Sequence, residues 1–388
     1  MHPLKVAARA QVPPFYVMDV LAAANARQRA HGDVVSFAAG QPATGAPAAV
    51  RAAVADAVSA DPGYTESLGL PALRAAIAGH YDRWYGTHVD PADVVVTTGS
   101  SGGFLLAFLA AFDAGDRVAL TRPGYPAYRN ILTALGCEVV DLPTLRPTPA
   151  DLAAAGPLAG VVVASPANPT GTVLAPEELA DLAAWCTANG TRLVSDEIYH
   201  GISYGARTAT AWATTRESIV VNSFSKYWGM TGWRLGWLLV PQQLRYAVEC
   251  LTANFTICPP TLSQQAAVAA FAEETYAEQD AHVARYAVNR QVLLSGLAAL
   301  GITRVAPADG AFYAYADVAH LTDDSMSFCH RLLADTGVAV VPGVDFDPVD
   351  GRRWIRFSFA GSTEDVREGL RRLGPWLGTN APARPLEG

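Results

Sequence analysis

The sequence predicts an α/β fold, with a large domain built on a mostly parallel sheet covered by helices and a smaller α+β domain after it. Three observations support this. Short apolar runs rich in β-branched residues recur along the first two thirds of the chain, Ala-rich stretches with a helical period fill the gaps, and the pattern changes after about residue 276. Alternating strands and helices favour a parallel sheet, because parallel neighbours need a crossover between them.

The expected strands of the large domain are short hydrophobic runs between turn residues. They are Val94-Val95-Val96-Thr97, Val118-Ala119-Leu120, Val161-Val162-Val163, Leu193-Val194 and Ile219-Val220-Val221. Helices are expected between them, including residues 104–112 and 176–187. The second of these begins with Pro176 and Glu177, which suit a first helical turn.

The smaller domain is expected to begin with one long helix, residues 276–300, followed by strands near 311–316, 338–341 and 354–358. Ser362-Thr363-Glu364-Asp365 fits a capping box that opens a last helix through Arg372. The Pro-rich end after Gly378 is expected to fray. We therefore expect a segment 1–45 that packs with the small domain, a large domain 46–275 and a small domain 276–388.

Composition limits the functional classes. A length of 388 residues excludes one small module, and 51% hydrophobic residues predict an ample core. The net charge of −8 disfavours nucleic-acid binding. No membrane segment is expected, because the uncharged tract 152–167 is broken by Gly156, Pro157 and Pro166.

A cytoplasmic location is expected from two features. Five scattered cysteines, none in a Cys-x-x-Cys pair, suit free thiols in a reducing compartment. Near the N-terminus, Pro13, Pro14 and Asp19 interrupt the apolar run that a signal peptide needs.

Polar side chains stand directly after the expected strands, at the edge of a parallel sheet where ligands bind. These segments are Gly99-Ser100-Ser101-Gly102, Tyr125, Asn168-Pro169-Thr170-Gly171, Asp196 with Tyr199, and Ser223-Phe224-Ser225-Lys226. The sequence therefore predicts that five loops from separate parts of the chain converge on one site.

The chemistry of these loops has both an ordinary and a functional interpretation. Lysines are usually solvated surface charges, but a desolvated Lys226 would have a lowered pKa and could form a Schiff base with an aldehyde. Asp196 is a helix cap or ion-pair partner, or it holds a ring nitrogen protonated. Five further groups would together bind a phosphate dianion, although each alone would be an ordinary cap or surface group. They are Ser100, Ser101, Ser223, Ser225 and Arg234.

Ser223-Phe224-Ser225-Lys226, with Met230-Thr231-Gly232-Trp233-Arg234-Leu235-Gly236, resembles the signature of the class I/II, fold type I aminotransferases. These enzymes depend on pyridoxal phosphate and form the aspartate aminotransferase-like superfamily. The resemblance extends from about Gly40 to Leu373. Further matching motifs are Gly63-Tyr64-Thr65, Gly69-Leu70-Pro71-Ala72-Leu73-Arg74, Asn168-Pro169-Thr170-Gly171, Asp196-Glu197-Ile198-Tyr199 and Arg356-Phe357-Ser358.

The resemblance implies roles for individual residues around the cofactor. Lys226 corresponds to the Schiff-base lysine and Asp196 to the aspartate facing the pyridine nitrogen, and both are expected to be catalytic together with Tyr199. Asn168 and Tyr199 correspond to the pair that hydrogen-bonds the phenolic oxygen, and Tyr125 to the aromatic ring stacked on the cofactor. The phosphate group is expected at Gly99, Ser100, Ser101, Ser223, Ser225 and Arg234.

The resemblance also implies the substrate contacts, the assembly and the reaction. Arg356 corresponds to the arginine that pairs with the substrate α-carboxylate, beside Gly40 and Asn168. Tyr64 matches a tyrosine that reaches the phosphate of the neighbouring subunit, which implies a homodimer with shared sites. The expected reaction moves an amino group between an L-amino acid and a 2-oxo acid by a ping-pong mechanism through a Lys226 Schiff base, as part of amino-acid metabolism.

Two positions leave the details of the site open. Residues 41–47 lack the acidic and aromatic pair that many relatives carry there, so the side-chain preference is not settled. Tyr227 and Trp228 are bulky for the turn after the lysine, and they either pack in the core or form a wall of the site.

Three alternatives remain. A β-lyase, decarboxylase, cyclase or oxidase could use the same scaffold and cofactor. An α/β-hydrolase would use Ser101 in Gly99-Ser100-Ser101-Gly102-Gly103 with His320 or His330. A regulatory protein would need a DNA-binding module, and only some 40 residues precede the matching region. The histidines form no ligand set, so no metal is expected; they are His2, His31, His80, His88, His200, His282, His320 and His330.

Overall fold

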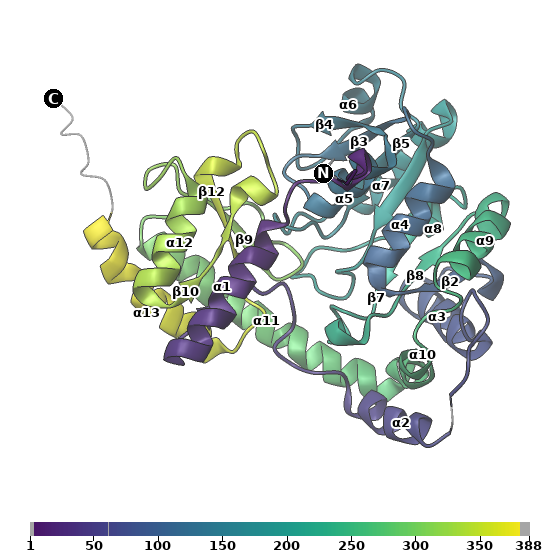
Figure 1. Ribbon diagram of the computed structural model, residues 1–388, viewed down its shortest axis with the longest axis horizontal. Coiled ribbons are helices and arrows are strands. Elements are labelled where there is room, and N and C mark those ends of the chain that lie inside the picture. The colour runs from purple at the N-terminus through teal and green to yellow at the C-terminus, as the bar shows by residue number, and fades with distance from the viewer. Residues whose placement is uncertain (1–3, 61, 381–388) are drawn as a thin grey trace.

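The central sheet of the large domain has seven strands in the order β2-β8-β7-β6-β5-β3-β4. A computed structural model describes residues 4–60 and 62–380 (Figure 1). β8 is antiparallel to both of its neighbours, whereas the other adjacent pairs are parallel. The predicted mostly parallel sheet is confirmed. Its strands are β2 (Val94–Thr97), β3 (Arg117–Thr121), β4 (Glu138–Leu142), β5 (Gly160–Ala164), β6 (Arg192–Asp196), β7 (Ile219–Ser223) and β8 (Gly236–Leu239).

Helices cover both faces of this sheet because its central strands are apolar on both sides. Within β5, Val161 and Val163 belong to one hydrophobic cluster and Val162 to another. The first cluster is completed by α2 (Ala48–Val58), α3 (Pro71–Tyr85), α6 (Pro149–Ala154), α7 (Pro176–Asn189), α8 (Ala211–Thr214) and α10 (Thr261–Ala267). The second is completed by α4 (Gly99–Ala111), α5 (Pro126–Leu135) and α9 (Arg245–Phe255).

The small domain holds a three-stranded antiparallel sheet in the order β11-β12-β9. A second, two-stranded sheet pairs β1 with β10 in parallel. The strands are β1 (Val35–Ser36), β9 (Tyr313–Asp317), β10 (Val338–Ala339), β11 (Val341–Pro342) and β12 (Trp354–Ser358). The helices here are α1 (Tyr16–His31), α11 (Glu273–Ala299), α12 (Ser325–Thr336) and α13 (Thr363–Asn380).

Several predicted boundaries differ from the structure. α4 begins at Gly99, earlier than residue 104, because Gly99 enters the helix with a φ of 71° and the following small residues continue it. α13 continues beyond Arg372 to Asn380, since Leu373, Trp376 and Leu377 keep one face buried past Pro375. Its predicted start holds, as Ser362 Oγ accepts a hydrogen bond from the Asp365 amide at 3.0 Å. Residues 381–388, most of the end expected to fray, lie outside the described part of the chain.

The two predicted domains are joined by one continuous helix. α11 runs from beside α2 and α10 to the small domain, so the predicted division at residue 276 falls inside it (Figure 1). On the N-terminal side, α1 packs through Val20 and Ala24 into a small-domain cluster with Val341 and Phe346. The exact domain limits remain predictions. In the described residues no helix is both long and apolar enough to cross a membrane.

Candidate active site

A cavity of about 420 Å³ lies at the carboxyl edge of the large sheet, next to the small domain and α1. The strand directions explain why distant loops meet there. β3, β5, β6 and β7 are parallel and end at one edge. β2 runs in the same direction as β7, because β2 and β7 are both antiparallel to β8. β8 begins at that edge, so Arg234, just before it, joins the same site.

Lys226 lies in the loop after β7 and points its amine into the cavity. Its Nζ donates a hydrogen bond to the carbonyl oxygen of Gly40 at 2.5 Å. Burial, reinforced by the nearby cations Arg356 and Arg234, lowers the pKa of Lys226 to about 8. About a tenth of this amine is therefore uncharged at pH 7, far more than for an ordinary lysine, and the uncharged form is the one that acts as a nucleophile.

Asp196 ends β6 and faces the same cavity. Its Oδ2 accepts a hydrogen bond from the Tyr128 hydroxyl, and its Oδ1 accepts one from the Ile198 amide at 3.0 Å. Burial raises the pKa of Asp196 to about 6, while these hydrogen bonds and Lys226 oppose that rise. At neutral pH the carboxylate is mostly ionised. It can therefore hold a proton on a ring nitrogen opposite it.

The amino end of α4 forms an anion-binding corner. Ser100 and Ser101 lie in its first turn, which contains no acidic residue, and both line the cavity with Ser225 and Arg234. A Cβ atom on Gly99 would lie 2.7 Å from Nη2 of Arg234, so only glycine lets the guanidinium approach this closely. Free amides of a helix start, three hydroxyls and a guanidinium together suit a phosphate dianion.

Ser223 is placed behind this corner. Its hydroxyl lies 2.9 Å from Ser225 Oγ and 3.0 Å from the Leu235 carbonyl oxygen, and it accepts a hydrogen bond from the Ser225 amide. Ser223 and Gly99 are not among the described residues that line the cavity. Their positions shape the corner without presenting a side chain to it.

Arg356, on β12, is a buried cation at the opposite side of the cavity, with 2% of its surface exposed. Nη1 donates to Asn168 Oδ1 at 3.0 Å and Nη2 to the Ala38 carbonyl oxygen at 2.9 Å. The guanidinium carbon lies 4.3 Å from the centre of the Tyr313 ring. Within the described residues Arg356 forms no ion pair and its Nε has no hydrogen-bond partner, so a bound carboxylate would compensate this charge.

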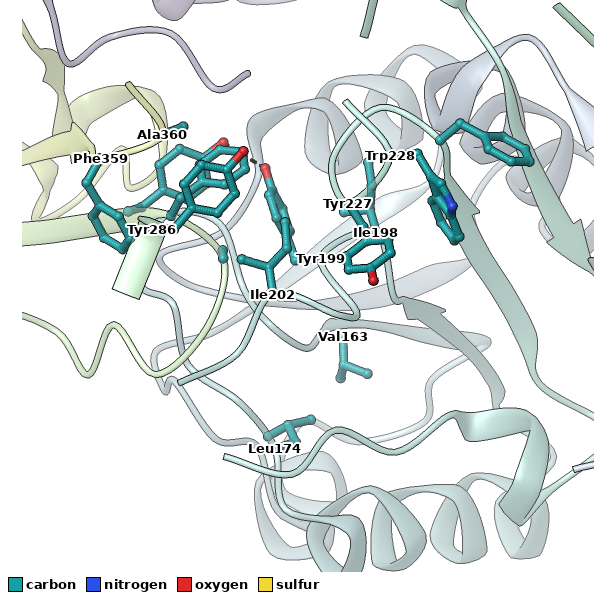
Figure 2. Packing of buried hydrophobic residues seen from close by; sticks show 14 of the residues in the cluster. Val163, Leu174, Ile198, Tyr199, Ile202, Tyr227, Trp228, Tyr286, Phe359 and Ala360 are labelled. Atoms are coloured by element: carbon teal, nitrogen blue, oxygen red, sulfur yellow. Dashed lines mark hydrogen bonds between the residues drawn. The ribbon is translucent and has the colours of Figure 1, made fainter. Parts of the chain in front are cut away.

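Two tyrosines predicted for the site line the cavity as neutral phenols. The Tyr199 hydroxyl lies 2.7 Å from that of Tyr313, the contact drawn as a dashed line at Tyr199 in Figure 2. Tyr125, after β3, packs edge-on against Tyr128 and Phe15, and burial raises the pKa of Tyr125 to about 12. The aromatic ring of Tyr125 thus forms one wall beside Asp196 and Ser101.

The motifs missed an apolar wall that comes from the N-terminal segment. Phe15, Val17, Met18 and Leu21 line the cavity from the start of α1. No residue pattern marked this wall, because α1 is far in sequence from every strand of the large sheet. Tyr128 was also missed, although its place one helical turn after Tyr125 is a signal that could have identified it.

Two other expectations concern residues outside the cavity. Tyr64 is 81% exposed, between α2 and α3, and is not among the described residues that line the cavity. Tyr227 and Trp228 are buried among aromatic side chains, including Trp84, and Figure 2 shows them in this hydrophobic interior. Neither lines the cavity, so the packing interpretation holds for both.

The side chains of this cavity fit pyridoxal phosphate. A lysine amine with a lowered pKa, a carboxylate for a ring nitrogen, an aromatic wall and a phosphate corner surround one space. A serine-hydrolase triad does not fit, because no histidine is among the described residues that line it. His320 and His330, the proposed partners of Ser101, are exposed on the small domain.

Comparisons with known proteins agree with this geometry. The profile of the family "Aminotransferase class I and II" matches residues 32–373. The valine–pyruvate aminotransferase of Mycobacterium tuberculosis is 62% identical over 382 residues, covering 96% of this chain and 98% of that protein.

Two solved structures extend the similarity to the fold. The crystal structure of an aminotransferase from Mycobacterium tuberculosis aligns with a TM-score of 0.95 at 62% identity, covering 97% of this chain and all of that one. Aspartate aminotransferase from Thermus thermophilus with maleate aligns with a TM-score of 0.90 at 32% identity, covering 96% and 100%. These matches confirm fold type I and make the hydrolase and regulatory alternatives wrong. The chain belongs to the class I and II aminotransferases, enzymes that use pyridoxal phosphate to move an amino group between an amino acid and a 2-oxo acid.

Proposed function

We propose that this aminotransferase uses an apolar L-amino acid such as valine as amino donor and pyruvate as acceptor. The name of its 62% identical relative supports this choice. One observation on the chain itself carries it. Within the part of the chain that the structure describes, the only charged residues lining the cavity are Asp196, Lys226, Arg234 and Arg356.

The distribution of these charges argues against a dicarboxylic donor. Arg234 belongs to the phosphate corner, so Arg356 is the one guanidinium left for the α-carboxylate of a substrate. The wall formed by Phe15, Val17 and Met18 offers no cation to a second carboxylate. Burying an unpaired carboxylate against apolar side chains is unfavourable, whereas an aliphatic side chain is stabilised there.

Each residue of the site then has a separate role in the reaction. Arg356 orients the α-carboxylate, and the amides of α4 with Arg234 hold the phosphate group. Pyridoxal phosphate supplies an aldehyde and a ring that withdraws electrons when its nitrogen is protonated. Asp196 keeps that nitrogen protonated, and Lys226 Nζ takes the α-proton of the bound amino acid. Tyr199 and Asn168 contribute hydrogen bonds beside them.

A homodimer with shared sites is part of the proposal. The segment that carries Tyr64 is held against the start of α10, since Thr261 Oγ1 donates to the Gly63 carbonyl oxygen at 2.8 Å. Tyr246, Phe255 and Ile257 are large apolar residues that are also exposed. Exposed aromatic and aliphatic side chains of this kind are typical of a subunit interface. Across it, Tyr64 reaches the phosphate corner of the partner subunit.

A cytoplasmic location is also proposed. All five cysteines are free thiols, and Cys137, Cys186 and Cys329 are buried. Free thiols are typical of proteins in a reducing compartment.

A panel of amino donors tests the substrate assignment. The purified enzyme loaded with pyridoxal phosphate is mixed with valine, leucine, alanine, aspartate or glutamate, and the 2-oxo acid is identified in a single half-reaction. We expect kcat/KM for valine to exceed that for aspartate by about a hundredfold, the effect of an unpaired buried carboxylate. A preference for aspartate would refute the proposal.

The stoichiometry of the same experiment tests the reaction type. Without an acceptor, an aminotransferase stops after one equivalent of 2-oxo acid per site, and adding pyruvate restores turnover with formation of alanine. Continuous ammonia release or oxygen consumption would instead indicate a lyase or an oxidase.

A further inference from the structure

The first turn of α1 is capped by a side chain from the opposite end of the chain. Asp345 ends the short helix η6 (Gly343–Asp345), between β11 and β12, and only 5% of its surface is exposed. Its carboxylate accepts hydrogen bonds from the Val17 amide at 2.9 Å and from the Tyr16 amide at 3.3 Å. These amides lack intrahelical partners, because they belong to the start of the helix.

The sequence of α1 supplies no cap of its own. The residue at its N-cap position is Phe15, whose side chain cannot accept a hydrogen bond. Asp345 therefore takes the place of an N-cap residue and puts a negative charge at the positive end of the helix dipole. Among the described residues Asp345 forms no ion pair, so the amides of α1 are the groups that its carboxylate holds.

This capped turn is the part of α1 that lines the active-site cavity. Val17 and Met18 face the cavity directly, and Phe15 packs edge-on against Tyr125 with ring centres 5.8 Å apart. The other face of α1 buries two residues, Val20 and Ala24, against the small domain, and partly buried Val17 packs against the same cluster. With so little apolar anchorage, the position of the first turn depends on its cap.

We infer that Asp345 is a positioning residue that holds the first turn of α1 over the cavity and thereby sets the preference for donors with larger apolar side chains. This inference rests on the proposed function, since it concerns how the same cavity selects an apolar donor. Asp345 touches neither substrate nor cofactor in this assignment. It acts through Phe15, Val17 and Met18.

Asp345 could also influence the site through its neighbour in sequence, Phe346. Phe346, the next residue, lies under Arg356, with the guanidinium carbon 4.9 Å from the ring centre. If Asp345 acted through Arg356, its loss would weaken capture of every amino acid, because all of them carry the α-carboxylate. If Asp345 acts through α1, its loss lowers kcat/KM for valine and leucine. The value for alanine stays unchanged, because the alanine side chain does not reach the wall.

The other end of α1 offers a matched control. Arg27 is paired with Asp33 at 2.7 Å, and its Nη1 donates to the Ala334 carbonyl oxygen, which holds this end to the small domain. Neither Arg27 nor Asp33 lines the cavity. The substitution Asp33→Ala removes a carboxylate that anchors the same helix at a distance from the wall.

The test compares Asp345→Ala, Asp345→Asn and Asp33→Ala with the unchanged enzyme, using valine and alanine as donors. We expect Asp345→Ala to lower kcat/KM for valine about tenfold, because loss of the cap displaces the wall that contacts the valine side chain, and to leave the alanine value within about twofold. Asp345→Asn keeps an acceptor oxygen and should restore most of the valine value. Asp33→Ala should leave the ratio of the two donors unchanged.

Amide hydrogen exchange of the cofactor-free protein gives a readout independent of activity. Exchange at residues 16–21 should accelerate in Asp345→Ala but not in Asp33→Ala. Unchanged exchange there, or an equal loss for valine and alanine, would overturn the assignment of Asp345. If the unchanged enzyme does not accept valine while exchange still responds to Asp345→Ala, the proposed substrate fails and the positioning of α1 by Asp345 stands.

Discussion

Lys226 is one of only two lysines in the chain, and the other, Lys5, lies near the N-terminus. The loop after β7 places its amine between two arginines and away from water. Both influences favour the uncharged amine. The reactivity of this residue is thus a property of the cavity rather than of the lysine side chain itself.

The first prediction concerns the pH dependence of this amine. In cofactor-free protein carrying Lys5→Arg, the rate of pyridoxal phosphate capture should rise with pH around a midpoint near 8, because only the uncharged Lys226 reacts and its pKa is lowered to about 8. Absorbance changes recorded between about pH 6 and pH 10 measure this rate. A midpoint near the ordinary lysine value of 10.5 would contradict the desolvated site.

Tyr128 carries the second prediction at the residue scale. Its hydroxyl donates to Asp196 and opposes the rise in the pKa of that carboxyl caused by burial. In Tyr128→Phe the pKa of Asp196 should rise above about 6, so that more of the carboxyl is protonated and neutral at pH 7. Loss of a hydrogen bond to a charged group should weaken retention of pyridoxal phosphate about tenfold or more and slow the half-reaction similarly.

Tyr204→Phe is the control for this prediction. Tyr204 also loses a hydrogen bond, from its hydroxyl to the Ala311 carbonyl oxygen at 2.7 Å, but it does not line the cavity. Equilibrium dialysis gives cofactor retention for both variants. Equal retention in Tyr128→Phe and the unchanged protein would show that Asp196 needs no such donor.

At the scale of elements, the junction between β2 and α4 decides how the phosphate corner is built. Thr97 Oγ1 donates to the Gly99 carbonyl oxygen at 2.8 Å, and a Cβ on Gly236 would lie 2.9 Å from the Gly99 carbonyl carbon. The start of α4 thus packs directly on β8. The Arg234 guanidinium fits beside this junction because Gly99 has no side chain.

The third prediction uses this close approach. Gly99→Ala should destabilise the protein by about 1–2 kcal/mol, because Gly99 has a φ of 71°, and it should also displace Arg234 and weaken pyridoxal phosphate binding. Gly86→Ala is the matched control, since Gly86 has a φ of 58° with no atom within 4 Å of the added Cβ. The midpoint temperature of thermal unfolding should fall in both variants. Cofactor affinity should fall in Gly99→Ala alone, and unchanged affinity there would refute the steric argument.

At the scale of the whole molecule, the core includes buried titratable side chains. His80 packs against Trp84 and Trp228, and its Nδ1 lies 2.8 Å from the Tyr276 hydroxyl. Burial lowers the pKa of both His80 and His200 to about 3. His80 joins α3 to Tyr276 of α11, and His200 lies within hydrogen-bond distance of Tyr85 at the end of the same α3, so protonation of either histidine disturbs the packing around this helix.

The fourth prediction is that His80 and His200 contribute a loss of stability as the pH falls from about 6.5 towards 3. In this range the unfolded chain binds protons at both histidines, whereas the folded chain keeps them neutral. His80→Gln should therefore reduce the slope of stability against pH, measured by denaturant unfolding between about pH 4 and pH 7. The same substitution at exposed His88 serves as control, and equal slopes in the two variants would contradict the assignment.

The fifth prediction concerns assembly. Light scattering should give twice the chain mass of 40.9 kDa, because the site is completed across a subunit interface. Tyr64→Phe should weaken retention of pyridoxal phosphate several-fold without changing this mass, as expected for one lost hydrogen bond. Tyr246→Phe, at another exposed tyrosine, should change neither quantity. An active monomer would refute the shared site.

Much of this arrangement could be predicted from the sequence. The runs that became β2, β3, β5, β6 and β7 are almost entirely apolar and rich in β-branched residues, which is typical of strands buried on both faces. Lys226, Asp196 and Asn168 stand directly after such strands, so a parallel sheet brings them to one edge. β4 was not predicted, because it is an edge strand with a charged, partly exposed sequence. β8 was not predicted, because it is short and begins at a glycine.

Only the tertiary structure decided which side chains complete the cavity. Asp345 reaches the first amides of α1 across more than three hundred residues, Tyr128 reaches Asp196, and Ser223 lies behind Ser225 and donates a hydrogen bond to it. Local patterns report which face of a segment is buried, because burial follows the period of a strand or helix. Contacts between distant segments depend on how the layers of the fold pack against each other, and no short stretch of sequence contains that information.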